Sequence, residues 1–443
     1  MNLNKMFAKS HFTVVCLVMF TIGLLPAGAD CSEILDLEKL LVISREANPI
    51  ILAAKARVRQ QEGRAIERRS YQMPQLYGSF GYEKLNRAPY SDAYDRVGGT
   101  KIGIVPMGYD DTYRAALSLT QVLYSGGTLT ARTKAEELLV TARKTELDRT
   151  IQQVGNGTRR AFYELQKSIS GAQVAREALD LASEHLRQVE IFYRTGAVAK
   201  NEVLRVQVSV SSSKLNLIQA ESNVKVAWKE LERITGQSLE ENYTVVAGDF
   251  DLEKFDIPED PLTKALALRP ELKGLEASRN AALQTVKAVK GQILPQVSLS
   301  AQASVADDKV FPSEEDKWKI GINAELRLFD SGKVHGQVVE AQGVAEELLY
   351  RIDDMKRDIG LDVSKARVNL DSAVQKVEVA EDSVVQSEED YRIAMKRYQN
   401  QMGTNIDVLD ARLALTDTRN ARTNAVAEAR TAYADLLYAM GEL

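Results

Sequence analysis

Cysteine and histidine are scarce in this sequence. There are two cysteines and three histidines among 443 residues, and His11, His185 and His335 are scattered along the chain. Cys16 lies in an N-terminal apolar stretch of the kind that is removed on secretion, which leaves Cys31 without a partner for an internal disulfide bond. No metal-ligand spacing, Ser/His/Asp set or phosphate-binding glycine loop occurs. We therefore expect no bound metal ion, no cofactor and no enzymatic activity.

Aromatic residues and prolines are also few. Aromatic residues make up 6% of the chain and prolines number 10, whereas alanine, leucine, valine and charged residues are abundant. Such a composition is typical of proteins that are built from long helices rather than from several compact domains. The net charge is −5, and charges of both signs are mixed along the chain, so nothing indicates a nucleic-acid partner.

The first residues have the pattern of a secretion signal. Lys5 and Lys9 precede an apolar run over residues 12–25, and small residues at 27–29 fit a cleavage site. We therefore expect a signal peptide over residues 1–29. The alternative is a membrane anchor, although the apolar run is short for a spanning helix.

The mature chain is expected to begin at Asp30. Lipidation of Cys31 is an alternative, and the charged Asp30 before it argues against this modification. After residue 29 no apolar run is long enough to form a transmembrane α-helix.

A heptad pattern extends over residues 147–193. Apolar and small residues recur there at alternating steps of four and three residues, without a break. They are Leu147, Ile151, Val154, Thr158, Ala161, Leu165, Ser168, Ala172, Ala175, Leu179, Ala182, Leu186, Val189 and Tyr193. This spacing predicts a coiled-coil helix, and from residue 128 onward it would be on the order of 100 Å long. On this stretch alone, the simplest interpretation is a coiled-coil rod.

The chain also contains an internal repeat. Asn48-Pro49 and Arg269-Pro270 each precede a helical segment, and the two segments end before equally spaced prolines, Pro74 and Pro295. From residue 123 onward the second copy follows the first without a gap, so that Tyr193 corresponds to Tyr398. A register that holds over such a length indicates duplication.

Each copy is expected to contain a helix, two strands and two long antiparallel helices that are joined by a tight turn. We divide the mature chain into a first repeat (30–236), an acidic linker (237–262) and a second repeat (263–443).

Four segments alternate between apolar and polar residues. The clearest places on one face Trp318, Ile320, Ile322, Ala324, Leu326 and Leu328. Residues 76–83, 113–120 and 297–305 show the same alternation, and each segment is long enough to cross a bilayer at a tilt. The apolar face would pack on a core in a soluble sheet, but it would face lipid in a membrane barrel.

A membrane barrel is the favoured reading of these strands. The helices already use their apolar seams on one another, and the signal peptide takes the chain out of the cytoplasm. Four strands cannot close a barrel, so several copies of the chain would have to share one.

Taken in order, these features resemble the outer-membrane efflux protein family, whose type member is TolC. The resemblance covers nearly all of the mature chain. It rests on the two proline-opened helices, on Leu-Tyr-Ser-Gly-Gly (123–127) and Leu-Phe-Asp-Ser-Gly (328–332) after the second and fourth strands, and on the turns at 193–204 and 398–411.

The resemblance implies a membrane α/β-barrel fold. Three copies would form a twelve-stranded barrel in the outer membrane of a Gram-negative bacterium and an α-helical tunnel in the periplasm. Such proteins are passive exit ducts of tripartite efflux or type I secretion systems. They dock to a periplasmic membrane-fusion adaptor and to an inner-membrane pump of the RND or ABC type. The alternative is a periplasmic coiled-coil scaffold or adaptor without a membrane barrel, in which the apolar strand faces would be covered.

In this family the helix–turn–helix tips close the periplasmic entrance. Asp407 and Asp410 match two rings of carboxylates, Tyr398 matches a gating tyrosine, and Glu202 matches an acidic partner in the first turn. Acidic rings at a narrow entrance select cations, and crowding of carboxylates raises their pKa. The alternative is that both aspartates are solvated charges at the start of a helix, where Asp407 interacts with the helix dipole.

The turns themselves are the expected docking surface for the adaptor. Gly196, Val198 and Gln401 would lie on the exposed tips, and ordinary turn chemistry is the alternative reading of these residues. The type member has a basic residue at the position of Gly403 in this chain, and Arg194 is a candidate for its replacement.

Overall fold

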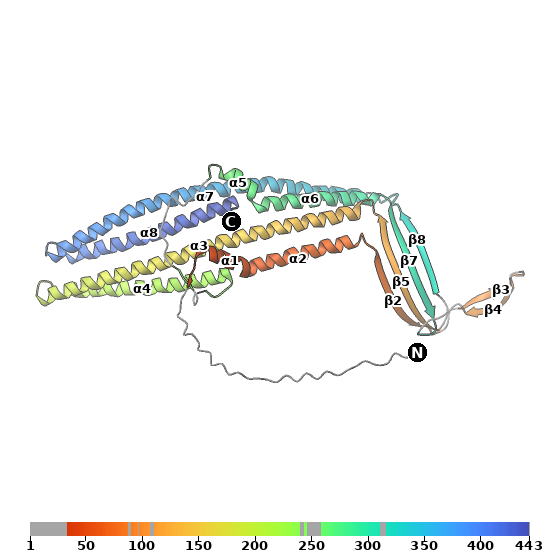
Figure 1. The fold of residues 1–443 in the computed structure, drawn as a ribbon, viewed down its shortest axis with the longest axis horizontal. Helices are drawn as coiled ribbons and strands as arrows, with labels where there is room; N and C mark the ends of the chain where they lie inside the picture. Colours follow the sequence, from red (N-terminus) through yellow and green to blue (C-terminus); the bar gives the residue numbers. More distant parts are fainter. Residues whose placement is uncertain are drawn as a thin grey trace, which may run out of the picture.

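The computed structural model describes residues 33–86, 90–95, 97–106, 110–239, 243–245, 258–310 and 316–442. The expected signal peptide over residues 1–29 and Cys31 lie outside this part. Figure 1 shows an elongated molecule in which long helices run side by side and a curved sheet continues from one end of them.

Two helices run the length of the helical part. α3 (Thr128–Arg194) and α7 (Lys333–Gln399) contain 67 residues each, which corresponds to about 100 Å at the usual rise per residue. Each helix begins directly after a glycine in the left-handed conformation, Gly127 in the first copy and Gly332 in the second. These bounds confirm the long helix that the heptad pattern predicts.

Four shorter helices pack along α3 and α7 (Figure 1). α2 (Pro49–Ser70) and α6 (Pro270–Lys290) cover the half that is nearer the sheet, whereas α4 (Lys200–Thr235) and α8 (Asn405–Met440) return from the far tips. The order α2-β2-β5-α3-α4 recurs as α6-β7-β8-α7-α8. The structure therefore confirms the duplication.

An apolar seam joins α7 to α8. Ile359 and Leu370 on α7 are fully buried in one cluster with Ala429 and Leu436 on α8. These α7 residues are heptad positions of the second copy, so the pairing of the two helices follows directly from the sequence pattern.

Along α3, the heptad seam accounts for only part of the buried surface. Leu165 and Val189 on the seam are fully buried, but Tyr193 is exposed, and Phe162 and His185 are buried although they lie off the seam. The reason is that α3 contacts α4 on one side and α2, α6 and α8 on others. A single stripe read from the sequence therefore underestimates how much of α3 is covered.

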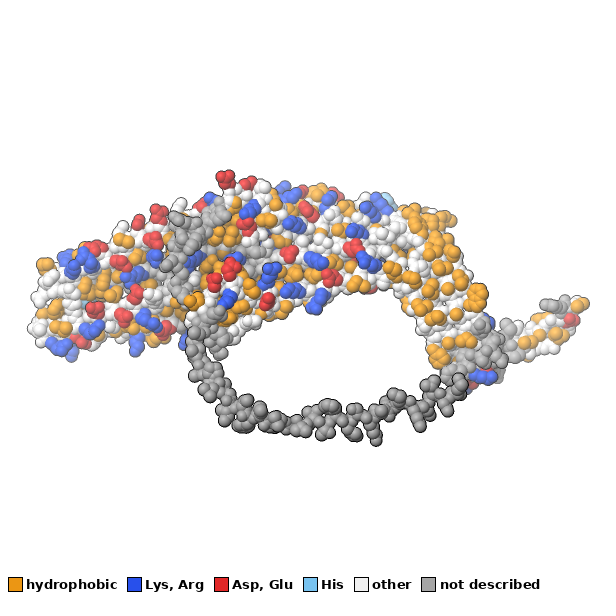
Figure 2. All heavy atoms as spheres, in the orientation of Figure 1, with side chains coloured by type: hydrophobic (Ala, Val, Ile, Leu, Met, Phe, Trp, Pro, Cys, Tyr) orange, Lys and Arg blue, Asp and Glu red, His pale blue; other side chains and the backbone are white. Residues whose placement is uncertain are grey.

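The four long strands form one antiparallel sheet in the order β2-β5-β7-β8. Their bounds are β2 (Gln75–Lys84), β5 (Asp111–Tyr124), β7 (Gln296–Asp307) and β8 (Asp316–Glu325). The register places apolar residues of all four strands in common rows, such as Gly78, Leu117, Ala303 and Trp318. The predicted alternation is therefore correct, and Figure 2 shows hydrophobic side chains gathered over the sheet.

The last strand is shorter than the alternation predicts. β8 ends at Glu325, so that Leu326 and Leu328 lie beyond it. The chain leaves the sheet there because it has to reach the turn at Ser331 and Gly332 that starts α7. Alternation in the sequence continues past the point where hydrogen bonding stops.

Short elements occupy segments for which the sequence pattern predicts no helix or strand. β3 (Tyr90–Tyr94) and β4 (Lys101–Pro106) form a hairpin between the first two predicted strands. α5 (Pro261–Leu268) begins inside the expected linker, because Asp260 caps it and Pro261 suits the first helical position.

Four further elements complete the described chain. α1 (Leu37–Ala47) precedes α2, η2 (Gly291–Ile293) follows α6, and β1 (Glu33–Ile34) pairs in parallel with β6 (Tyr243–Thr244). Within the described residues, no helix combines the length and the apolar character that crossing a membrane requires.

Candidate functional site at the helical tips

The two tight turns at the tips have the same backbone geometry. Gly196 and Gln401 occupy equivalent left-handed positions, with φ of 75° and 58°. The Gly196 N–H donates to the Tyr193 carbonyl and the Gln401 N–H donates to the Tyr398 carbonyl, each at 3.0 Å. Gln401 therefore adopts a conformation that favours glycine, and both residues are exposed as expected for the tips. Val198 differs from that expectation, because it is half-buried and packs against the cluster around Tyr398.

Gly403 has no side chain that could form a charged contact between the two hairpins. In the described part of the chain, Arg194 does not form one either. A Cβ atom at Gly403 would lie 3.1 Å from the Cβ of Arg397, so this position is tightly packed. The Arg194 guanidinium donates to the Glu190 carbonyl of its own helix at 3.4 Å. The candidate replacement for the missing basic residue is thus directed along α3.

Tyr398 is buried inside one chain, with 4% of its surface exposed. It lies in an apolar cluster with Val189, Val203, Val206 and Val408. Its ring centroid is 5.1 Å from that of His185 and 5.7 Å from that of Phe192. Burial, together with the nearby charge of Glu202, raises the pKa of Tyr398 to about 12, so the phenol is neutral. Its hydroxyl is buried and has no hydrogen-bond partner within the described residues.

Asp407 is an exposed residue in the first turn of α8. Its carboxylate accepts from the Thr404 N–H at 2.9 Å, and its own N–H donates to the Thr404 hydroxyl at 3.2 Å, which completes a capping box. The hydrogen bonds with Thr404 hold the pKa of Asp407 below its usual value. Within one chain this is the opposite of the increase that crowding was expected to produce, because the capping bonds favour the ionised form.

Asp410 and Glu202 take separate positions around the tips. Asp410 is exposed on α8, one turn after Asp407, and lines a groove between α8 and the α3/α4 hairpin. Glu202 is half-buried in the first turn of α4. Glu202 is therefore the acidic residue whose charge acts on Tyr398, whereas the two aspartates point their charges to solvent.

His185 and Arg412 are site residues that the sequence analysis missed. His185 is fully buried on α3, and its Nε2 lies 2.7 Å from Oδ1 of Asn405, the first residue of α8. The Arg412 guanidinium donates to the Ser213 hydroxyl at 3.0 Å, to the Ala178 carbonyl at 3.3 Å and to the Ser209 hydroxyl. Arg412 is 8% exposed, and burial lowers its pKa.

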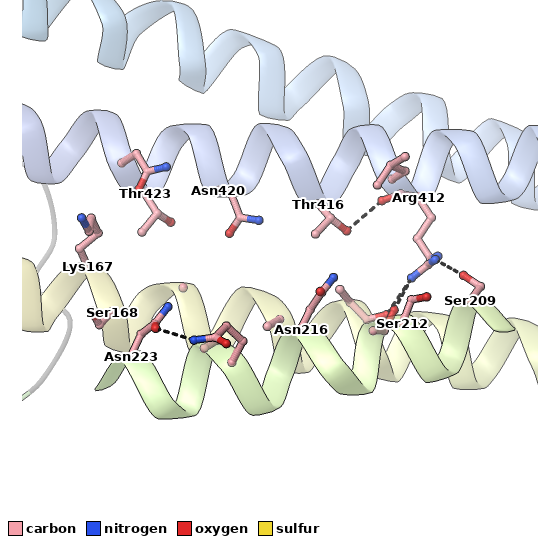
Figure 3. Close-up of a pocket in the computed structure, with 18 of the residues that line it drawn as sticks. Lys167, Ser168, Ser209, Ser212, Asn216, Asn223, Arg412, Thr416, Asn420 and Thr423 are labelled. Atoms are coloured by element: carbon pink, nitrogen blue, oxygen red, sulfur yellow. Dashed lines mark hydrogen bonds between the residues drawn. The ribbon is translucent and has the colours of Figure 1, made fainter. Parts of the chain in front are cut away.

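Polar side chains face one another across the groove beside Arg412. The groove has a volume of about 970 Å³. Figure 3 shows Arg412 reaching from α8 to Ser209 on α4, with hydroxyl and amide groups along both walls. These groups include Ser212, Asn216, Asn223, Thr416, Asn420 and Thr423.

Away from the apolar cluster around Tyr398 at the tips, charged side chains join the two hairpins. Arg419 on α8 bridges Glu177 on α3 at 2.8 Å and Glu388 on α7 at 2.7 Å. Nearer the sheet, Asp435 accepts from Arg160 on α3 at 2.6 Å. The α7–α8 seam, by contrast, is apolar. The α7/α8 hairpin thus has its own apolar core, and it meets α3 through the apolar cluster around Tyr398 at the tips and through polar bonds farther from them.

Comparison with known proteins shows what this architecture is similar to. The chain is 22% identical to the outer membrane protein TolC of Salmonella enteritidis over 450 residues, which cover 96% of this chain and 86% of that protein. It is 23% identical to the outer membrane efflux protein BepC of Brucella suis over 433 residues, which cover 97% of this chain and 90% of that protein.

Solved structures show the same fold. The crystal structure of the CmeC outer membrane channel of Campylobacter jejuni matches with a TM-score of 0.77 at 19% identity, and the match covers 92% of this chain and 85% of that chain.

The family model described as "outer membrane efflux protein" matches residues 40–237 and 262–442, which together are most of the chain. The alternative of a periplasmic scaffold without a membrane barrel gains no support from these matches. The chain belongs to the outer-membrane efflux protein family, whose members are channels of the outer membrane and not enzymes.

Proposed function

We propose that three copies of this chain form a passive exit duct, with a twelve-stranded barrel in the outer membrane and a helical tunnel in the periplasm. The observation that carries this proposal is the four-stranded sheet, which has an apolar exposed face and, within the described residues, an open outer edge on each end strand, β2 and β8. Trp318, for example, is 76% exposed. Backbone groups in lipid have to be paired, so each open edge calls for a strand of a neighbouring copy.

A second apolar stripe on α4 supports contacts between copies. Leu204, Val208, Leu215 and Ile218 follow heptad-like steps on the side of α4 that faces away from α3, and all four are exposed. Leu215 is 67% exposed. A helix with two apolar stripes can join its own hairpin and a neighbouring one at the same time.

The duct would work with two further proteins. A periplasmic membrane-fusion adaptor would dock at the tips around Gly196, Val198 and Gln401, and an inner-membrane pump of the RND or ABC type would supply the energy. The resemblance to an efflux protein over nearly the whole chain favours efflux, and type I secretion is the second candidate.

The tips would form the periplasmic entrance. Asp407 and Asp410 would present carboxylates there. Tyr398 would pack the helices α3, α4 and α7 together, and Glu202 would lie near Tyr398. The polar junction between α3 and α8 supports a movable entrance, because separating it exposes groups that water can hydrogen-bond.

The assembly is tested by detergent extraction of the outer membrane. We expect the protein to be recovered in that membrane and to purify as a trimer. A monomer that stays dissolved in plain buffer would contradict the proposal, since its apolar strand faces would then have no lipid to cover them.

The role of the carboxylates is tested by charge removal that keeps the side-chain shape. The double variant Asp407→Asn and Asp410→Asn is expected to lose cation selectivity in planar bilayers. Because its capping bonds hold the pKa of Asp407 below its usual value, the contribution of Asp407 to the wild-type selectivity should persist as the pH falls to about 4 and decline only below it. Unchanged selectivity in the double variant would remove both residues from the entrance.

A further inference from the structure

His185 connects three helices at the tip. It lies on α3, its ring meets Tyr398 of α7 edge-on, and its Nε2 bonds the side chain of Asn405, where α8 begins. The His185 side chain is 0% exposed within a single chain. Neighbouring copies therefore cannot reach it, and its partners are those that this chain supplies.

The hydrogen bond to Asn405 leaves His185 with one unpartnered ring nitrogen. With the Asn405 amide oxygen facing Nε2, as in this structure, Nε2 carries the hydrogen and Nδ1 carries the lone pair, while the Asn405 Nδ2 has no partner within the described residues. Nδ1 is buried and has no partner within the described residues. A second proton at Nδ1 would have no acceptor, and the resulting imidazolium would be buried without a hydrogen bond on that side.

The charges around His185 oppose that second proton. Arg412 on α8 acts on His185, and Glu202 on α4 acts on its ring partner, Tyr398 of α7. Tyr391 of α7 lies in the same cluster, where Arg412 and Glu184 of α3 act on it. Both phenols are neutral at physiological pH, because burial raises their pKa values. Among the charged groups, the positive Arg412 acts directly on His185.

We propose that His185 positions the first turn of α8 in the closed entrance, and that protonation of His185 at mildly acidic pH releases this turn and favours opening. This inference rests on the proposed function, in which the tips form the entrance. His185 is a positioning residue here, since it holds α8 through Asn405 and contacts no cargo.

The direction of the pH effect follows from linkage. In the closed state, burial first and Arg412 second lower the pKa of His185, and the hydrogen bond to Asn405 only partly offsets them. In an open, hydrated tip the imidazole would return to its ordinary pKa of about 6.5. The open state then binds more protons, so opening is favoured as the pH falls below that value and is insensitive to His185 above it. Each copy contributes up to about tenfold in the opening equilibrium per pH unit.

Histidine NMR provides a direct test on the assembled protein in detergent. The mature chain contains only His185 and His335, and His335 is exposed. With ring-labelled histidine we expect His185 to titrate below the ordinary histidine pKa of about 6.5. Titration of His185 at or above that value would overturn the inference. This measurement uses the wild-type protein and does not depend on the folding of a variant.

The release of α8 is tested by hydrogen exchange of residues 405–409. After correction for the intrinsic effect of pH, protection is expected to fall between pH 7.5 and 5.5 in the wild type. The His185→Gln variant can still donate to Asn405 but does not titrate, so its protection should stay constant. His335→Gln is the matched control and should behave like the wild type. An equal loss of protection in His185→Gln would overturn the inference.

Conductance in planar bilayers separates this inference from the proposed function. Opening of the wild type and of His335→Gln is expected to rise as the pH falls from 7.5 to 5.5, whereas His185→Gln should show no rise. If the exchange at α8 responds to His185 but conductance does not, the inference about His185 stands and the tips are not the entrance. If conductance rises equally in His185→Gln, His185 is not the group that senses pH.

Discussion

At the scale of single residues, comparing the two copies shows why a glycine is needed at a given position. Either a neighbouring atom leaves no room for a Cβ atom, or the backbone adopts a conformation that favours glycine. Gly126 and Ser331 occupy the same place in the two copies, and both have a positive φ, 62° and 55°. A serine can therefore adopt this conformation. A Cβ atom on Gly126, however, would lie 2.2 Å from the Gly291 carbonyl oxygen. Glycine is needed at 126 because the start of α3 approaches the end of α6 there.

Gly126→Ala is accordingly expected to destabilise the protein more than the same substitution at the neighbouring residue, Gly127→Ala. Gly127 also has a positive φ, 78°, but a Cβ atom there would meet nothing within 4 Å. Both variants carry the cost of a left-handed side chain, and Gly126→Ala should add about 1–3 kcal/mol of steric strain. The melting temperature of the purified protein in detergent measures the difference. Equal melting temperatures for the two variants would show that the close approach to Gly291 is relaxed.

The polar residues at the tip could not be predicted from the sequence. His185 and Asn405 are far apart along the chain, as are Arg412 and Ser213, and no periodic pattern links them. A polar residue inside a helical pattern is usually taken as solvated, and only the packing of α8 on α3 and α4 buries these four. Asp407, by contrast, could be placed at a helix start from the sequence, because Thr404 precedes it at the spacing of a capping box.

At the scale of elements, the long periodic segments were predictable and the short ones were not. The heptads predict α3 and α7, and strict alternation predicts the four strands of the sheet, because each pattern extends over many residues. The strands β3 and β4, with five and six residues, and the eight-residue helix α5 are too short to show a clear period. Their positions depend on contacts with the rest of the chain.

The two faces of β8 lead to opposite expectations for the same substitution. Ile322 lies in the apolar rows of the sheet and Asn323 lies on the other face, where it pairs with Ser298. Ile322→Lys should cost about 2–4 kcal/mol if that position is near the middle of the membrane, whereas Asn323→Lys should be tolerated on the water-facing side. The amount of each variant recovered in the outer membrane measures this difference. Equal recovery would mean that the apolar face of the sheet does not contact lipid.

At the scale of the whole molecule, the apolar and polar contacts are distributed unequally among the helices. The α7–α8 seam and the first hairpin bury hydrocarbon along their length. Between the two hairpins, an apolar cluster surrounds Tyr398 at the tips, and farther from the tips α8 meets α3 through Arg412, Arg419 and Asp435. Separating an apolar seam exposes hydrocarbon to water, which is unfavourable in proportion to the area. Separating a polar junction exchanges protein partners for water at a smaller cost. The α7/α8 hairpin is therefore expected to move as one body when the tips open.

Arg412 provides the sharpest test of that motion because it is the buried cation of the junction. Arg412→Ala removes the bonds to Ala178, Ser209 and Ser213 and leaves a cavity, so the closed arrangement should weaken by about 1–3 kcal/mol. This corresponds to roughly a 5- to 150-fold increase in the opening equilibrium, measured as conductance at neutral pH. Arg205→Ala is the matched control, because Arg205 lines the same groove but is exposed. If both variants conduct like the wild type, the α3–α8 junction does not hold the entrance closed, and the restraint lies instead in contacts between copies.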